Sequence, residues 1–365
     1  MLKRFSVQGY RTFEHEIVLD LSKTRDYQFN TRNVREGIVN NALIVGPNAS
    51  GKSNLGRAIA DICDIYRRRA DGDDALEDVL YLNADCGSGL ARFEYVFQFG
   101  EDEVTYAYDK SPDGAFHHER LLLGNRIVFD YENDESRFLE GDLSLVGADG
   151  INRRFEDDFL SMLSYISNSV PRESLGVLDE LRSFVSNMSF ADPHPDRRPY
   201  AEAYVRRIVR LGKVEEFEEF LRRFGVDERL CEVTEPDGRK SIYSEHSQRL
   251  IPFSAACSSG TRTLLYLYAW YVLRPQKTLV FLDEFDAYCH FEMAEKLIDF
   301  FGESTSCQTI CTTHNTSLVQ NDVMRPDCVF LLSAKKTLAA LSDRTSRELR
   351  YGHNIEKLLR NGEFG

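Results

Sequence analysis

The chain has 365 residues, with 45 Lys and Arg against 59 Asp and Glu, which gives a formal net charge of −14. This length allows one large or two ordinary domains, and a hydrophobic content of 42% excludes a disordered or fibrous protein. The acidity is local, because residues 71–160 hold 7 basic and 23 acidic side chains and the remainder holds 38 and 36. The net charge therefore argues against nucleic-acid binding only for that segment.

Neither a membrane segment nor a secretory signal is predicted. The longest apolar stretch, residues 263–273, is much shorter than the ~20 residues that a membrane helix needs. No apolar segment follows the basic residues of the N-terminus, and the eight cysteines show no CxxC spacing. These features predict a protein of the reducing cytoplasm without membrane contact.

The first part of the chain predicts a strand, loop and helix unit. Residues 3–20 have the pattern of two short strands around a turn, and residues 41–45 form a short apolar strand. A Gly-rich turn follows, and then an amphipathic helix with Leu55, Ala58 and Ile59 on one face.

The middle of the chain changes character twice. From residue 92 apolar and polar side chains alternate, which predicts antiparallel strands at 92–99, 104–108, 116–122 and 126–131. Residues 155–188 and 199–224 have mostly helical patterns without the sustained heptads of a long coiled coil. The last third predicts alternating helices and strands at 259–273, 278–282, 291–301, 308–313 and 328–332.

A glycine-rich motif lies between the strand at 41–45 and the helix. It matches G-x-x-x-x-G-K-[ST] in full, and its residues are Gly46, Pro47, Asn48, Ala49, Ser50, Gly51, Lys52 and Ser53. Glycines let several backbone N–H groups point into one concavity, where they bind phosphate oxygens together with the helix N-terminus. In such a loop Lys52 reaches the β- and γ-phosphates and Ser53 ligates Mg²⁺, so the sequence predicts a nucleotide site.

An apolar strand near residue 280 ends in two adjacent acids, Asp283 and Glu284. An Asp at a strand end can hold Mg²⁺ through water, and a Glu directly after it can polarise an attacking water as general base. Adjacent acids favour hydrolysis over phosphate transfer to a small molecule. The sequence has no Asn-Lys-x-Asp motif for reading guanine, so ATP is favoured over GTP.

Two further segments are interpreted together with these motifs. His314 follows the predicted strand at 308–313, where it could contact a γ-phosphate, although a lone strand-end His is more often structural. Ser258, Ser259 and Gly260 open a predicted helix whose free N–H groups form either an anion site or an ordinary capped start.

With these motifs in this order, the sequence resembles the ABC-type ATPase heads of the SMC, RecF and OLD (overcoming lysogenization defect) group. Within that group it is most similar to the compact AAA-family ATP-binding proteins of bacterial anti-phage defence operons. The matching segments are GYRTF, GPNASGKSN, FSAACSSGTRTLLYL, TLVFLDEFDAYCH, QTICTTHNTSLV and YGHNIEKLLRNGEFG.

The resemblance implies a mechanism in which two heads enclose two ATP molecules. Each nucleotide would lie on the P-loop of one subunit, which extends through Asn54, and under Ser258, Ser259 and Gly260 of the other. The roles it implies are Mg²⁺ binding by Asp283, water activation by Glu284, γ-phosphate contact by His314, a dimer crossing at Asp286 and nucleotide approach by Arg11.

The implied fold class is α/β, a P-loop NTPase with an ABC-type ATPase head, an antiparallel β lobe and a helical insertion. We expect the N-terminal half of the head with the lobe at 1–135, a mainly helical insertion at 136–245 and the C-terminal half of the head at 246–365. Two departures stand out. The family's glutamine loop has only a weak candidate, Gln98, and the signature segment lacks the second glycine of transporters, so transport is not implied.

The chain thus carries ATPase motifs without a second catalytic cluster. We predict an ATP-hydrolysing switch that forms a homo-oligomer through its ATP sandwich and controls a separately encoded nuclease or toxin in anti-phage defence. Only 51 residues follow His314, too few for the Toprim nuclease domain of OLD proteins. The acidic residues Asp71, Asp73, Asp74 and Glu77 suggest a docking surface for a basic partner.

Two other functions stay open. A RecF-like repair ATPase could bind DNA through basic runs at 67–69, at Arg206, Arg207 and Arg210, and in the tail at 333–365, although solvated helix faces explain such runs as well. Alternatively, ATP could act as structural glue in a scaffold with negligible turnover.

Overall fold

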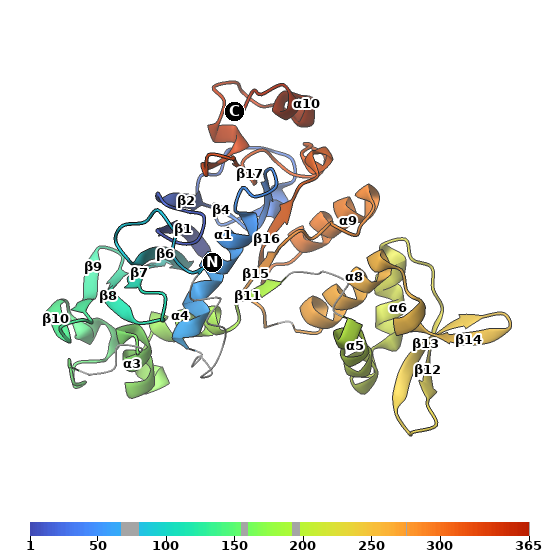
Figure 1. Ribbon diagram of the computed structural model, residues 1–365, viewed down its shortest axis with the longest axis horizontal. Coiled ribbons are helices and arrows are strands. Elements are labelled where there is room, and N and C mark those ends of the chain that lie inside the picture. Colours follow the sequence, from blue (N-terminus) through green and yellow to red (C-terminus); the bar gives the residue numbers. More distant parts are fainter. Residues whose placement is uncertain (67–79, 155–159, 192–197, 275, 365) are drawn as a thin grey trace.

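Two large sheets enclose the helix that follows the P-loop (Figure 1). The computed structural model describes residues 1–66, 80–154, 160–191, 198–274 and 276–364. Within these residues, no helix is both long and apolar enough to cross a membrane. The proposed acidic docking residues 71–77 and the basic run 67–69 lie outside the described residues.

A seven-stranded antiparallel sheet forms the lobe predicted from the alternating pattern. In spatial order its strands are β10 (Arg137–Glu140), β9 (Arg126–Glu132), β8 (Phe116–Leu123), β7 (Asp102–Lys110), β6 (Ala91–Phe99), β1 (Leu2–Gln8) and β2 (Ile17–Asp20). On β6, Phe93, Tyr95 and Phe97 are buried, whereas Arg92, which precedes them in the strand, is exposed. The N-terminal hairpin therefore completes a sheet whose other strands come from residues 91–140.

The second sheet carries the predicted nucleotide motifs. In spatial order its strands are β11 (Ser189–Ala191), β15 (Leu279–Leu282), β16 (Gln308–Thr313), β5 (Asn41–Val45), β17 (Val329–Leu332) and β18 (Leu338–Ala340). All neighbours are parallel except the last pair. Strands β5, β15 and β16 are buried along their whole length, as expected for a sheet covered on both faces.

Helices cover both faces of this parallel sheet. On one face, Gly56 of α1 (Lys52–Asp61) packs so closely on Phe281 that a β-carbon would lie 2.4 Å from the ring. The antiparallel lobe covers the outer side of α1, where Tyr95 donates a hydrogen bond of 2.8 Å to the Ala58 carbonyl. On the opposite face, Asn41 donates to the Ile298 carbonyl of α9 (Phe291–Gly302). Helix α1 is thus held between the two large sheets.

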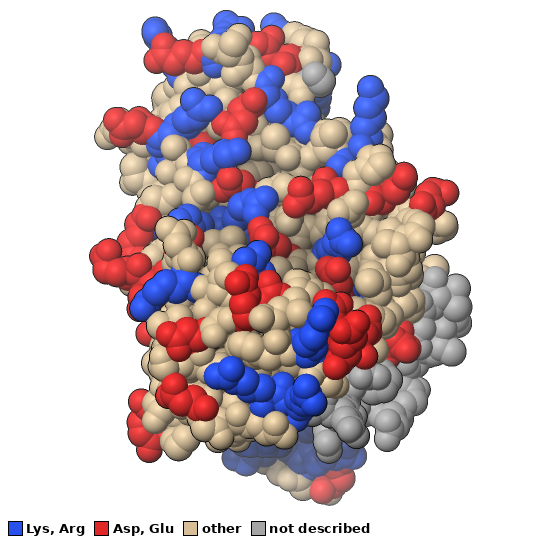
Figure 2. All heavy atoms as spheres, turned by 90° about the vertical axis from the view of Figure 1, so that its left-hand side faces the viewer, with Lys and Arg blue, Asp and Glu red and all other residues tan. Residues whose placement is uncertain are grey.

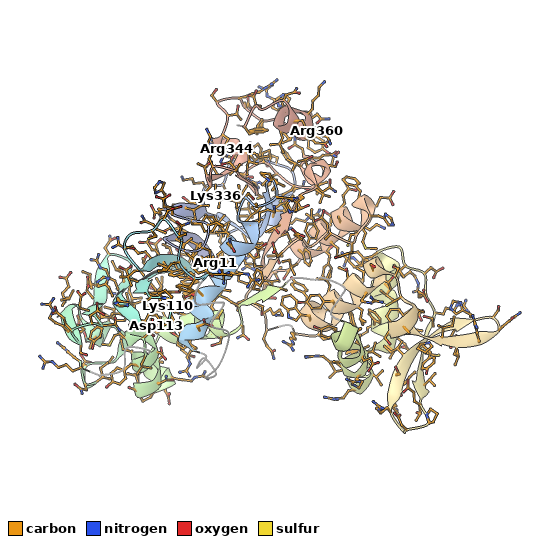
Figure 3. All side chains as sticks on the ribbon, in the orientation of Figure 1. Arg11, Lys110, Asp113, Lys336, Arg344 and Arg360 are labelled. Carbon is orange, nitrogen blue, oxygen red and sulfur yellow. The ribbon has the colours of Figure 1, made fainter. Side chains whose placement is uncertain are left out.

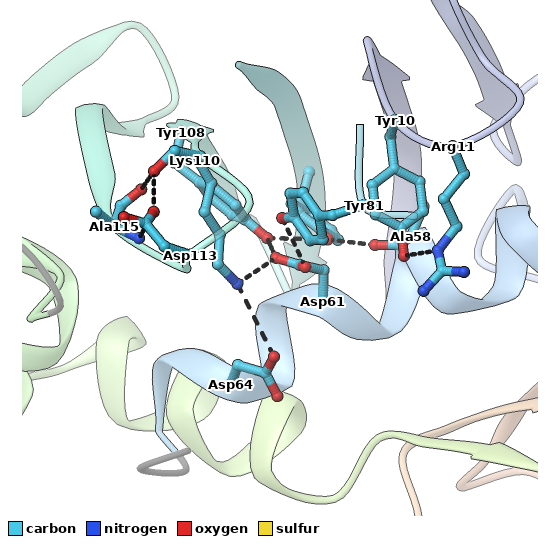
Figure 4. Close-up of polar contacts among 12 residues, drawn as sticks. Tyr10, Arg11, Ala58, Asp61, Asp64, Tyr81, Tyr108, Lys110, Asp113 and Ala115 are labelled. Atoms are coloured by element: carbon cyan, nitrogen blue, oxygen red, sulfur yellow. Dashed lines mark hydrogen bonds and ion pairs between the residues drawn. The ribbon is translucent and has the colours of Figure 1, made fainter. Parts of the chain in front are cut away.

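A buried polar cluster fixes the far end of α1 to the lobe (Figure 4). The Asp61 carboxylate accepts hydrogen bonds from Tyr81 Oη at 2.9 Å, Tyr108 Oη at 2.8 Å and Lys110 Nζ at 3.0 Å. Only about a twentieth of the Asp61 and Lys110 side chains is exposed. A buried carboxylate requires such partners, because desolvation without them is costly.

The insertion contains the predicted helices and also an unpredicted sheet. Its longer helices are α3 (Met162–Ser169), α4 (Val177–Ser186), α5 (Arg198–Arg210) and α6 (Val214–Arg223). The strands β12 (Leu230–Thr234), β13 (Lys240–His246) and β14 (Arg249–Pro252) then form an antiparallel sheet that projects from the body (Figure 1). The expectation of a mainly helical segment overlooked the Asp237-Gly238 turn, a hairpin signal between two alternating runs. The division into three parts stays a prediction.

The C-terminal third returns to the parallel sheet. Helices α7 (Phe253–Ala256) and α8 (Ser259–Leu267) follow the projecting sheet, and α8 continues as a π-helical turn over Tyr268–Val272. After β18 the chain ends in α10 (Ile355–Arg360), above the parallel sheet in Figure 1. A two-stranded ribbon, β3 (Val34–Arg35) with β4 (Ile38–Val39), precedes β5.

Candidate active site

Three parallel strands bring the sequence motifs to one edge of the sheet. Strand β5 leads into the glycine-rich loop, β15 leads into the two acids, and β16, which lies between them, leads into His314. The carboxyl ends of parallel strands meet at the same edge, so segments more than 200 residues apart become neighbours. This juxtaposition depends on β16 pairing with β5 on one side and β15 on the other.

The P-loop backbone needs its glycines. Gly51 has a φ of +108°, and a β-carbon there would lie 2.8 Å from Thr12 Oγ1 and 3.0 Å from the Phe13 ring. At Gly46 a β-carbon would lie 2.3 Å from the Leu332 carbonyl oxygen. Both positions exclude larger residues, and the loop then delivers the backbone to the N-terminus of α1, which favours anions.

Lys52 is the first residue of α1 and lies across the mouth of the loop. Its Nζ donates to the carbonyl oxygens of Gly46 at 2.9 Å and Pro47 at 3.3 Å. Burial lowers the pKa of Lys52, and the carboxylates of Glu284 and Asp283 oppose that shift. The ammonium group is therefore placed where a phosphate could replace the loop carbonyls as its partner.

Thr312 holds the two acids after β15. Its hydroxyl donates to Asp283 Oδ1 at 2.7 Å and accepts from the Glu284 N–H at 2.8 Å. Glu284 has a φ of +48°, an uncommon conformation for a residue with a side chain. The bonds from Thr312 fix this backbone, which turns the Glu284 side chain toward His314.

His314 connects the acid to the lysine. Its Nε2 lies 3.0 Å from Glu284 Oε1 and 3.1 Å from Lys52 Nζ. The next acid, Asp286, accepts a hydrogen bond of 2.8 Å from Thr313 Oγ1, and burial raises the pKa of Asp286. The predicted lysine, base and strand-end histidine thus meet in one contact network.

A cavity of ≈ 530 Å³ opens in front of these residues. Its lining consists of Thr12, Asn48, Ala49, Ser50, Gly51, Lys52, Ser53, Asn54, Glu284 and His314. Thr12 was not predicted; it accepts a hydrogen bond from Asn54 at 3.1 Å and closes one side of the cavity. Ser50 Oγ is buried without a hydrogen-bond partner among the described residues.

Arg11 does not line this cavity. Its Nε donates to the Tyr10 hydroxyl at 3.0 Å, and its guanidinium lies 5.5 Å from the centre of the Tyr10 ring. Figure 4 shows the Arg11 side chain beside Tyr10, next to the cluster around Asp61. The neighbouring residue in the predicted turn, Thr12, is the one that faces the P-loop.

The other expected residues also lie outside the cavity. Ser258 caps α8, accepting a hydrogen bond of 3.1 Å from the Thr261 N–H, and both Ser258 and Ser259 are exposed. Gly260 comes close to the Tyr288 carbonyl, which a β-carbon would approach to 3.1 Å. Gln98 lies at the end of β6 and donates to the Gly100 carbonyl, so it does not complete this site.

Oxygen ligands suited to Mg²⁺ are present. Ser53 lines the cavity, whereas the buried Asp283 lies between the end of β15 and Glu284, which lines the cavity. Mg²⁺ is commonly bound by one or two protein oxygens together with phosphates and water, so a hydroxyl and a carboxylate fit this ion. The described residues contain no cluster of three or more His, Cys, Asp or Glu that would form an all-protein metal site.

The fold and the site together define a P-loop nucleotide-binding protein. A protein family described as "AAA domain, putative AbiEii toxin, Type IV TA system" matches residues 42–320. The chain belongs to this family, and it is an ATP-binding P-loop protein. The expected α/β class with an antiparallel lobe is confirmed. No curated protein matches the chain significantly.

Among solved structures the chain is similar to SMC head domains. The head domain from Thermotoga maritima is 18% identical with a TM-score of 0.45, and the match covers 90% of this chain and 94% of that one. The Smc head with an extended coiled coil, bound to the C-terminal domain of ScpA and derived from Pyrococcus furiosus, is 16% identical with a TM-score of 0.48, covering 94% and 97%. The Smc head with a coiled coil and joint derived from Pyrococcus yayanosii is 12% identical with a TM-score of 0.48, covering 99% of each chain.

Proposed function

We propose that this protein is a Mg²⁺-dependent ATPase switch whose heads dimerise around ATP and thereby control a separate effector protein. The contact of Glu284 with His314, beside Lys52 at an open cavity, is the observation that carries the hydrolytic part. It places a carboxylate where it can accept a proton from water near a bound γ-phosphate.

Each residue of the site has a defined task in this reaction. The P-loop and Lys52 bind and orient the phosphates, and Glu284 accepts the proton of the attacking water while His314 keeps its carboxylate in place. Bound at Ser53 and Asp283, Mg²⁺ would neutralise phosphate charge. The products are ADP and inorganic phosphate, with the water proton passing to Glu284 and then to solvent.

Dimerisation is supported by the start of α8, which lies outside the cavity. Ser258 and Ser259 are exposed at the N-terminus of the nine-residue helix α8, and they do not line the cavity of their own subunit. A second subunit that presents this helix start to the nucleotide would add N–H donors to the γ-phosphate. ATP would then serve as part of the dimer interface.

Replacing the base should trap this dimer. We expect Glu284→Gln to lose at least about 100-fold in kcat, because general base catalysis contributes at that scale, and to become dimeric when ATP is added. Mass measurement by light scattering, with and without ATP, provides the readout. The matched control is the double variant Lys52→Ala with Glu284→Gln, which should stay monomeric. A monomeric Glu284→Gln protein at saturating ATP would contradict the sandwich.

Control of an effector is supported by the family description and by the composition of the described site. The family description names a putative toxin of a type IV TA system, and the residues of this site support ATP hydrolysis. Copurification of the neighbouring gene product with Glu284→Gln in the presence of ATP would support the switch. If effector binding and toxicity were identical in wild type and Glu284→Gln, the scaffold function would replace it.

The surface charges do not favour the DNA-repair alternative. In α5, Arg206 pairs with Glu202 and Arg207 donates to the Leu273 carbonyl. In the tail, Arg350 pairs with Glu348 and Arg360 with Glu356. Figure 2 shows acidic and basic side chains interspersed over the lobe side of the molecule, so that face forms neither a basic nor an acidic patch. An affinity for DNA that falls steeply as the salt concentration rises would instead support the DNA-repair function.

A further inference from the structure

A lysine from the C-terminal hairpin contacts the back of the P-loop. Lys336 lies in the turn between β17 and β18, and its Nζ donates to the carbonyl oxygens of Ala49 at 2.5 Å and Ser50 at 3.0 Å. In sequence these partners are separated by more than 280 residues. Lys336 does not line the nucleotide cavity, so it touches the loop from outside.

The planarity of the peptide bond explains what this contact can do. The carbonyl of Ala49 and the N–H of Ser50 belong to one rigid trans unit and point in opposite directions, as do the carbonyl of Ser50 and the N–H of Gly51. A cation that fixes the two carbonyls therefore aims the two N–H groups away from Lys336. Ala49, with a φ of +59°, and Gly51 both have left-handed backbones that need such support.

The turn that carries Lys336 is itself fixed. Ser333 closes it through bonds of 3.0 Å from its N–H to the Thr337 carbonyl and 2.7 Å between the two hydroxyls. Lys336 has a φ of +60°, and its N–H donates to the Ser333 carbonyl. The ammonium group is thus presented by a rigid turn, and this lowers the entropy that the contact with the loop must overcome.

Arg344 ties this turn to the end of the chain. Its Nη2 donates to Thr337 Oγ1 at 2.9 Å and to the Thr337 carbonyl at 3.1 Å, while Nη1 donates to the carbonyl of the buried Phe364. Lys336 and Arg344 lie in the same upper part of the molecule, beside the C-terminal segment, in Figure 3. A continuous set of contacts therefore runs from the C-terminal residues to the P-loop.

We propose that Lys336 is a positioning residue for ATP. It holds the P-loop in its phosphate-binding conformation, and Arg344 holds the turn that carries Lys336. This inference rests on ATP binding at the P-loop and not on hydrolysis or dimerisation. A loop that is less often in the binding conformation has a proportionally weaker apparent affinity. The C-terminal hairpin thereby sets how tightly ATP binds, because it contacts the carbonyl groups of two residues that line the cavity.

The neighbouring lysine offers a matched control. Lys335 is exposed in the same turn and has no hydrogen bond or ion pair among the described residues. Lys336→Gln and Lys335→Gln remove the same charge one residue apart. We expect Lys336→Gln to raise the Kd for a fluorescent ATP analogue roughly 3- to 10-fold, as for loss of a charge-assisted hydrogen bond, with Lys335→Gln close to wild type.

Three further measurements separate positioning from a general effect on stability. Lys336→Arg should restore affinity, KM should rise for Lys336→Gln with kcat at saturation unchanged, and the thermal unfolding midpoints of the Gln variants should agree. Equal Kd values for Lys336→Gln and wild type, or equal weakening by both Gln variants, would overturn the inference. Failure of wild type to hydrolyse ATP would instead count against the proposed function, since Kd is measured without turnover.

The link to Arg344 can be tested without removing a charge. Thr337→Val deletes the hydroxyl that contacts both Arg344 and Ser333, and we expect it to raise the Kd, as Lys336→Gln does. In the double variant Thr337→Val with Lys336→Gln, the Kd should match that of Lys336→Gln alone, because both changes act through one contact. Additive effects of the two changes would show that the turn and the lysine act independently.

Discussion

At the scale of single residues, Thr312 has the most specific task in the site. Its hydroxyl bonds both acids after β15, donating to Asp283 and accepting from the Glu284 backbone. A threonine in a buried strand would ordinarily be read as a packing residue. Here its hydroxyl keeps the general base in a left-handed backbone conformation that a peptide would otherwise leave.

Replacing Thr312 by Val should therefore slow hydrolysis while the fold is kept. We expect kcat to fall about 3- to 10-fold, the value of one net hydrogen bond, with a smaller change in the Kd for ATP. Steady-state ATPase kinetics, combined with equilibrium ATP binding, measure both effects.

Two companion variants make this result interpretable. Thr312→Ser keeps the hydroxyl and should retain most of the activity. Thr309→Val changes a fully buried threonine of the same strand whose hydroxyl has no hydrogen-bond partner among the described residues, and it should leave kcat unchanged. If Thr309→Val and Thr312→Val slow the enzyme equally, the loss comes from strand packing.

The motif residues could be predicted from the sequence, whereas the residues that support them could not. Lys52, Asp283, Glu284 and His314 belong to short patterns with a known chemical logic, and His314 contacts both Lys52 and Glu284. Thr12, Thr312 and Lys336 act through contacts that depend on register and strand order. Nothing in the residues beside them indicates which backbone groups they will meet.

At the scale of elements, α1 is fixed at both of its ends. Its N-terminus carries the P-loop, and its C-terminus is bound to the lobe through Asp61, Lys110 and two tyrosines. Ten residues of helix therefore connect the nucleotide to the antiparallel sheet as a rigid unit about 15 Å long. A movement of the lobe would therefore move the P-loop that binds the phosphates, and a movement of the P-loop would move the lobe.

Breaking the buried ion pair should destabilise this connection strongly. We expect Asp61→Asn to lower the free energy of unfolding by about 3 kcal/mol, since it leaves Lys110 buried beside a neutral side chain. Urea denaturation followed by circular dichroism gives the value. The pair of Arg92, which is exposed, with Asp109, which is partly buried, lies in the same lobe and provides the control, and Arg92→Gln should cost less than about 1 kcal/mol. Similar losses in both variants would contradict the special role of burial.

Most helices and strands were predicted from the periodicity of the sequence, and the strands that were missed were missed for physical reasons. The longer strands of the lobe and of the parallel sheet lie close to their predicted ranges, because their alternation or uniform burial is long enough to recognise, whereas the short strands β10 and β18 were not predicted. Strand β11 has only three residues and is defined by its pairing with β15. Three residues are too few to show an alternating pattern, so this strand is recognised from its tertiary pairing and not from its sequence.

At the scale of the whole molecule, the exposed start of α8 and the separate cavity predict complementation between defective subunits. Lys52→Ala should destroy the P-loop side, and Ser259→Arg should destroy the helix start without disturbing the core, since Ser259 is exposed. Each variant alone should be inactive. Mixed together, the subunits should regain about a quarter of wild-type ATPase activity, because half of the random dimers hold one intact composite site.

The same mixture can disprove the arrangement. Activity that stays absent at concentrations where both variants form dimers would show that each cavity works within one subunit or not at all. A mixture of Lys52→Ala with Glu284→Gln is the control, since both changes affect the same side of the site and no intact composite site can form.

The strand order of the parallel sheet also constrains how the protein is made. Strand β5 is synthesised early, yet its partners in the described part of the chain are β16 and β17, whose paired residues follow 268 and 286 positions later. At ordinary translation rates its two edges stay unpaired for on the order of ten seconds or more, while the lobe can already fold from local hairpins. An apolar strand with open edges is prone to aggregate, so the nascent chain needs a chaperone or rapid release. ATP cannot help at that stage, because its site does not exist until the last third of the chain has emerged.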